Sequence, residues 1–199
     1  QFPRIASYGG EIVEETFTAA SFVPEDNEYL SVFVNWELDA PNFFDDNDLR
    51  VSANWLAGHG ATSKLSFSGS SVNELSDNSE AVFRNFSHME LMLGSISAAP
   101  VSERILLGGR NLRGFYPREI GRTTNGDFTD WGERWSLTSQ FELLWPIRGE
   151  FIDASVGVHA DLGLISDDNF DIESYGSVGL IAELGSFEDV SIQLTLSRN

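Results

Sequence analysis

The chain of 199 residues contains no cysteine, which excludes disulfide bonds, thiolate nucleophiles and cysteine-ligated metals. It also lacks any run of about 18 consecutive apolar residues, so a membrane-spanning helix is excluded. Basic residues are scarce: 12 Lys and Arg stand against 31 Asp and Glu, for a formal net charge of −19. This excess of negative charge argues against nucleic acid as a partner and against binding to anionic lipid through a basic patch.

Motifs for chemistry are missing as well. His59, His88 and His159 lie on separate segments without metal-ligand spacing, and the acidic run 45–48 lacks the ligand pattern of an EF-hand. There is no Gly-x-Ser-x-Gly nucleophile elbow and no phosphate-binding loop. The many carboxylates are compatible with a glycosidase-like pair, but no two are singled out. We therefore expect no metal, no cofactor and no enzymatic activity.

Apolar and polar residues alternate with a period of two through much of the chain. In Arg134–Ile147, Trp135, Phe141 and Trp145 share the apolar face, with a tryptophan near each end. Similar runs cover residues 30–38, 49–55, 64–70, 83–93, 151–165 and 190–197. Runs of about ten residues match a tilted membrane strand, and aromatic residues at both ends are typical of interface girdles.

Acidic segments separate these runs, at residues 24–28, 45–48, 76–80 and 166–169. We interpret them as turns. Residues 1–199 are therefore predicted to form a single all-β region of roughly nine or ten strands. Its fold would be an antiparallel membrane β-barrel, or the carboxy-terminal portion of one, with acidic loops.

One segment departs from the alternation. Between residues 103 and 122, Gly108, Gly109 and Gly114 surround Arg113. Glycine permits positive φ and close backbone approach, while carboxylates can hold a guanidinium group. Taken alone, Leu112–Phe115 favours a surface turn with a solvated arginine.

The longer run from Ala98 to Phe115 resembles the bacterial surface antigen family, the BamA/TamA-type outer-membrane barrels that insert or export proteins. The similarity covers a strand, a Gly-Gly turn and an Arg-Gly-aromatic loop tip. The resemblance implies that the loop folds back into the barrel lumen, where acids on the inner wall of the following strands hold its arginine.

Two further motifs supply those acids. Glu142 lies in a segment, 141–147, that resembles the family's next strand, and Asp161 lies in a segment, 159–163, that resembles the strand after it. His159 stands where the family has an aromatic residue. Asp153 is a competing match, but it follows Pro146 closely and lacks the glycine, so Asp161 is favoured. The implied lumenal latch consists of Gly108, Gly109, Arg113, Gly114, Phe115, Glu142 and Asp161.

Elementary electrostatics supports the same grouping. An arginine enclosed in a partly dry lumen needs carboxylates to offset the cost of leaving water. A bidentate contact between Arg113 and Glu142, with Asp161 nearby, would hold the loop in one geometry. The alternative is that each acid faces lumenal water.

The resemblance is clearest over residues 80–199. The family closes a sixteen-stranded barrel with a terminal strand that ends in an aromatic residue, whereas this chain ends Leu196-Ser197-Arg198-Asn199. Its last run therefore resembles a penultimate strand, and a fragment or a shortened relative is expected. Further barrel strands or another subunit would then close the sheet, because an open edge in lipid leaves backbone groups unpaired.

These expectations define the predicted function. The chain would be an outer-membrane β-barrel for protein insertion or translocation, without a chemical step. Its partners would be outer-membrane lipid and a client polypeptide. Two alternatives belong to other classes: a soluble or surface-exposed acidic β-sandwich that binds a ligand, and a passive barrel that anchors a separate enzyme domain.

Overall fold

The computed structural model describes residues 4–15, 27–38, 46–57, 61–75, 80–121, 131–148, 153–185 and 191–198. Within them, nine strands and two short 3₁₀ helices follow one another along the chain. The elements are β1 (Arg4–Glu15), β2 (Asn27–Leu38), β3 (Asp46–Ala57), β4 (Ala61–Glu74), β5 (Val82–Gly94), η1 (Ile96–Ala98), η2 (Val101–Glu103), β6 (Trp135–Arg148), β7 (Asp153–Ser166), β8 (Ile172–Gly185) and β9 (Ser191–Arg198).

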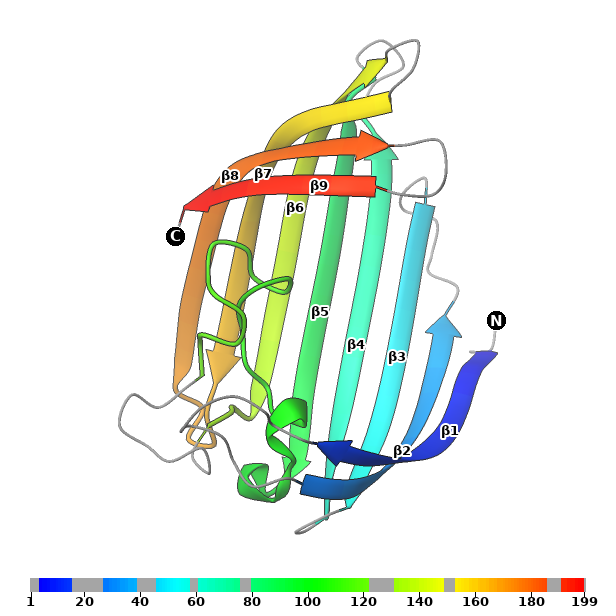
Figure 1. Ribbon diagram of the computed structural model, residues 1–199, viewed down its shortest axis with the longest axis vertical. Coiled ribbons are helices and arrows are strands. Elements are labelled where there is room, and N and C mark those ends of the chain that lie inside the picture. The colour runs from blue at the N-terminus through cyan, green and yellow to red at the C-terminus, as the bar shows by residue number, and fades with distance from the viewer. Residues whose placement is uncertain are drawn as a thin grey trace.

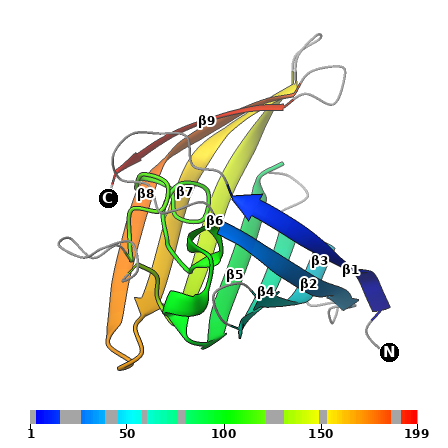
Figure 2. The same ribbon diagram turned by 60° about the horizontal axis from the view of Figure 1, so that its bottom comes forward.

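The strands form one sheet in the order β1 to β9, and each pairs antiparallel with the next. Figures 1 and 2 show that this sheet is strongly curved, with β9 arching across the concave side. The all-β antiparallel class predicted from the sequence is confirmed. The described strands do not close into a barrel, because β1 and β9 are the two edges of the sheet.

Each predicted run that the structure describes lies on a strand, but the alternation did not mark out β1 or β8. His59 lies outside the described residues, as do residues 24–26, 45 and 76–79 of the acidic segments. Residues 27–28 and 46–48, which were interpreted as parts of turns, instead begin β2 and β3. The segment 166–169 is described and forms the turn between β7 and β8.

The two faces of the sheet reverse the usual pattern of a soluble protein. Apolar side chains on the convex face are exposed: Val158 by 45%, Leu162 by 58% and Leu180 by 60%. Polar side chains on the concave face are buried, and these include Ser136, Thr138, His159, Asp161 and Ser177. Neighbouring residues of a strand point to opposite faces, so one alternation produces both surfaces.

The connection between β5 and β6 lies on the concave side of the sheet (Figure 2). We call its described residues, 95–121 and 131–134, the connecting loop. Its apolar side chains form the main buried cluster together with the inner wall, and the members of this cluster are Met92, Ala99, Ile105, Leu107, Leu112, Ile120 and Ile165. The hydrophobic core thus lies between the loop and the wall. Among the described residues, no helix is both long and apolar enough to cross a membrane.

Candidate functional site

The middle of the connecting loop folds back on itself in a tight turn. Leu107 and Ile120 exchange two backbone hydrogen bonds, of 3.1 and 3.0 Å. Gly108 has a φ of +120°, and a Cβ added there would lie 2.1 Å from the carbonyl oxygen of Tyr116. Both facts require glycine, because no other residue adopts this conformation and leaves that space.

Polar side chains fix the shape of the turn and attach it to the wall. The backbone N–H of Gly108 donates to Asn111 Oδ1 at 2.8 Å, and Asn111 Nδ2 donates to the carbonyl oxygen of Leu106 at 3.2 Å. Gln140 on β6 donates to the carbonyl oxygen of Arg110 at 2.7 Å. The turn is therefore braced internally and tied to the strand that follows it.

Arg113 lies between two acids of the inner wall, and we call Arg113, Glu142 and Asp161 the arginine clamp. Its Nη1 donates to Glu142 Oε1 at 2.5 Å, and its Nη2 donates to Asp161 Oδ1 at 2.5 Å. Asp161 Oδ2 also accepts hydrogen bonds from Nε at 2.8 Å and from the backbone N–H of Arg113 at 2.9 Å. The bidentate partner is thus Asp161 on β7, while Glu142 on β6 accepts a single hydrogen bond.

The clamp is largely removed from solvent. The side chain of Asp161 is fully buried, and those of Arg113 and Glu142 are 13% and 15% exposed. Burial alone would lower the pKa of Arg113, but its hydrogen bonds and charge interactions with Asp161, and then with Glu142, raise that pKa overall. The guanidinium therefore stays charged, and the two carboxylates offset the cost of its desolvation.

The tip of the loop packs on β8 and β9. The ring of Phe115 meets the ring of Tyr175 edge to face, with centroids 5.8 Å apart, and the N–H of Gly109 donates to the carbonyl oxygen of Phe115. A Cβ added to Gly114 would lie 2.9 Å from the Cβ of Ser177 on β8. The same position is 3.3 Å from the Cβ of Ser197 on β9. The tip therefore approaches the wall too closely for a larger residue.

The structure brings the seven residues of the implied latch into one assembly. Gly108, Gly109, Gly114 and Phe115 shape the turn and its tip, and Arg113 reaches both acids. Asp153, the competing match, occupies the first position of β7. The role of this assembly as a functional latch stays a prediction.

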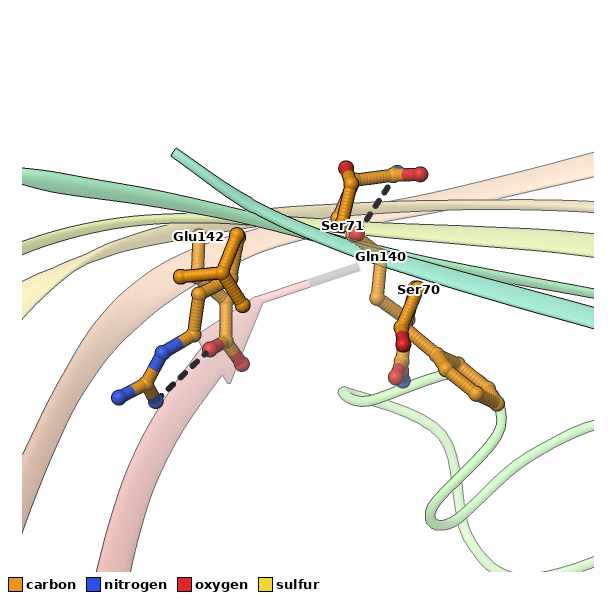
Figure 3. Close-up of a pocket in the computed structure, with 8 residues that line it drawn as sticks. Ser70, Ser71, Gln140 and Glu142 are labelled. Carbon is orange, nitrogen blue, oxygen red and sulfur yellow. Dashed lines mark hydrogen bonds and ion pairs between the residues drawn. The ribbon is translucent and has the colours of Figure 1, made fainter. Parts of the chain in front are cut away.

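A second arginine, which the sequence did not single out, extends this charge network. Arg84 on β5 donates to both carboxylate oxygens of Glu183 on β8 at 2.9 Å, and its Nη1 lies 3.9 Å from Glu142 Oε2. Figure 3 shows Glu142 and Gln140 on one side of the sheet and Ser71 on the other. Arg84 lies directly opposite Glu142 in the register of β5 and β6, which the sequence alone does not fix.

The base of the loop is held by two more cations. Arg104 is buried and donates to three backbone carbonyl oxygens of the connecting loop, those of Ser97, Ala99 and Trp131. Lys64 on β4, the only lysine of the chain, lies 2.7 Å from Glu103 Oε2. The loop is therefore anchored at its base as well as at its tip.

The acids around the β7–β8 turn crowd one carboxyl group of the loop. Burial of Glu133, followed by the negative charges of Asp167, Glu173 and Asp168, raises the pKa of Glu133 to about 7. Near neutral pH this carboxyl group is therefore protonated in a large share of molecules. The base of the loop then carries less negative charge than the sequence indicates.

His159 brings a serine and an aspartate together in the order of a catalytic triad. Its Nε2 lies 2.9 Å from Ser197 Oγ, and its Nδ1 lies 3.4 Å from Asp161 Oδ1. However, both oxygens of Asp161 already accept hydrogen bonds from Arg113, and Gly114 packs against Ser197. A triad needs an acid that is free to orient the imidazole and a serine that a substrate can reach. This arrangement therefore suits a structural role.

The described residues contain no group of three or more His, Asp or Glu side chains placed to hold a metal ion. No family model matches the chain, and no curated protein matches it.

Proposed function

We propose that this chain is part of an outer-membrane β-barrel of the BamA/TamA type, which inserts or translocates proteins without a chemical step. One observation carries this proposal: apolar side chains are exposed on the convex face, while polar and charged side chains are buried beneath the loop on the concave face. Transmembrane barrels have this distribution, because lipid surrounds the wall and water or protein fills the lumen.

In this account the connecting loop is a lumenal latch. The arginine clamp holds the loop against β6 and β7, and its tip rests on β8 and β9. A loop held at these points occupies part of the lumen and confines a client polypeptide to the space that remains. The latch thus stabilises the wall and positions the path of the client.

The open edges of the sheet define the remaining partners. Within the described residues, the sheet has β1 and β9 at its two ends. Unpaired backbone groups in hydrocarbon cost several kcal/mol each. Further barrel strands or another subunit therefore pair with these edges, and outer-membrane lipid covers the convex face.

The β-sandwich alternative has less support. A sandwich buries the apolar face of one sheet against a second sheet. The described strands form a single sheet, and apolar residues such as Leu162 and Leu180 remain exposed. The passive anchor has the same kind of wall but no client polypeptide, and it carries a separate enzyme domain. A measurement of client folding therefore separates it from our proposal.

The test is reconstitution of the native polypeptide, extracted from its membrane, into lipid vesicles. We expect extraction to require detergent, and we expect the vesicles to fold an added unfolded β-barrel client into a protease-protected form faster than empty vesicles do. Extraction without detergent would contradict the membrane assignment. A protein that enters vesicles but folds clients no faster than empty vesicles would instead be the passive anchor.

A further inference from the structure

We propose that His159 is a positioning residue that joins the arginine clamp to β9. The binding of the connecting loop to the wall then determines the position of this strand. The inference starts from the register of the sheet. Glu142, His159, Gly179 and Ser197 lie directly opposite one another on β6, β7, β8 and β9. One row of inward-facing positions therefore runs from the clamp to the edge of the sheet.

Gly179 allows the imidazole to cross this row. A Cβ built at Gly179 would lie 2.5 Å from His159 Nε2, so a residue with a side chain at position 179 would occupy the place where the ring lies. With that space open, Nε2 reaches Ser197 Oγ at 2.9 Å, two strands away. The side chain of His159 is completely buried, and its ring therefore has little freedom to leave this position.

The other ring nitrogen faces the clamp. His159 Nδ1 lies 3.4 Å from Asp161 Oδ1, the oxygen that accepts the hydrogen bond from Arg113 Nη2. Nδ1 makes no hydrogen bond while Arg113 engages both oxygens of Asp161, so the imidazole is held through Nε2 alone. When Arg113 leaves, Asp161 loses three hydrogen bonds and becomes free to turn toward the imidazole. The pull on Nδ1 then changes the contact that Nε2 makes with Ser197.

β9 is the strand most sensitive to this contact. It has eight residues, pairs with β8 alone among the described strands, and leaves Leu194 and Leu196 exposed by 62% and 76%. Among its described side chains, Ser197 contacts His159 and the tip residue Gly114, and Gln193 donates to Glu183 at 3.3 Å. An edge strand with few side-chain contacts depends strongly on each of them.

The test is hydrogen–deuterium exchange of the purified protein in detergent, followed on peptides from β9 and β7. In His159→Ala and Ser197→Ala we expect exchange across β9 to rise about tenfold while β7 stays protected. His159→Gln should restore protection, because an amide can also bond Ser197. Thr195→Val is the matched control, since it removes a hydroxyl group from the same face of β9 and should leave exchange unchanged. Should His159→Ala fail to fold, Ser197→Ala gives the same answer with the imidazole intact.

Transmission from the clamp is tested by a double-mutant cycle. Arg113→Ala should raise exchange in β9, and the same change made in a His159→Ala background should add little. Full additivity of the two effects, or unchanged β9 exchange in both His159→Ala and Ser197→Ala, would overturn the proposal. This inference rests on the proposed latch, but the hydrogen–deuterium exchange experiment requires no client polypeptide. A protein that fails to insert clients and still shows the coupling would refute the proposed function and keep this inference.

Discussion

Replacing Arg113 with alanine is expected to lower the free energy of unfolding by about 3–5 kcal/mol and to release the loop from the wall. The reason is the burial of its partners. Asp161 is fully buried and loses its two hydrogen bonds from the guanidinium, and Glu142 loses its hydrogen bond from Arg113 Nη1. Two carboxylates left close together without their cation cost far more than the lost contacts alone, because both were already removed from water.

Thermal unfolding in detergent, read as the loss of the compact band on unboiled gels, measures this effect. Arg110→Ala is the matched control, because Arg110 belongs to the same turn, is exposed, and contacts Gln140 only through its backbone. Arg113→Lys keeps the charge but not the planar fork, so an intermediate loss is expected. Equal unfolding temperatures for Arg113→Ala and Arg110→Ala would contradict the clamp.

Gly108→Ala is expected to have an effect of similar size, about 3 kcal/mol, without removing any charge. Its Cβ would meet the carbonyl oxygen of Tyr116 at 2.1 Å, and a φ of +120° strains any residue with a side chain. Because the obstacle is backbone, the turn itself must open. The loop then cannot place Arg113 between both acids.

Limited trypsin digestion measures this opening through cleavage after Arg110 and Arg118 in the folded protein. Gly176→Ala is the matched control: a Cβ there meets its neighbours at ordinary distances of 3.4 and 3.5 Å, and Gly176 has no positive φ. We expect rapid cleavage in Gly108→Ala and wild-type resistance in Gly176→Ala. Equal resistance in the two variants would show that the turn does not depend on glycine.

Much of the fold could be predicted from the alternation, and the exceptions have physical causes. β8 was not recognised because Gly176 and Gly179 interrupt its pattern, and Gly179 lies where the ring of His159 approaches the strand closely. β1 carries Gly9 and Gly10 at its centre, which weaken the signal of a strand in the same way. Both omissions therefore trace to glycine within a strand.

Only some residues of the site could be identified from the sequence. Arg113, Glu142 and Asp161 stand out because each belongs to a short motif. Arg84 and Glu183 belong to no motif of the clamp, and His159 belongs to one only as a departure from its aromatic residue. The contacts of all three depend on register and on the curvature of the sheet. Arg84 and Glu183 are 99 positions apart in the chain and meet across two intervening strands. Local sequence carries no information about such a contact.

The central claim is that the convex face of this sheet lies against lipid while its concave face borders an aqueous lumen. Gln193 and Leu194 are neighbours on β9 that point to opposite faces, and both are exposed. Because the chain has no cysteine, a single Cys substitution at either position can carry a spin label without further changes.

The measurement is the accessibility of each label, in protein reconstituted into lipid vesicles, to oxygen and to a water-soluble nickel chelate. The account predicts that the label at position 194 collides mainly with oxygen dissolved in lipid and the label at position 193 mainly with the chelate. Chelate access at both positions would contradict a membrane-facing wall.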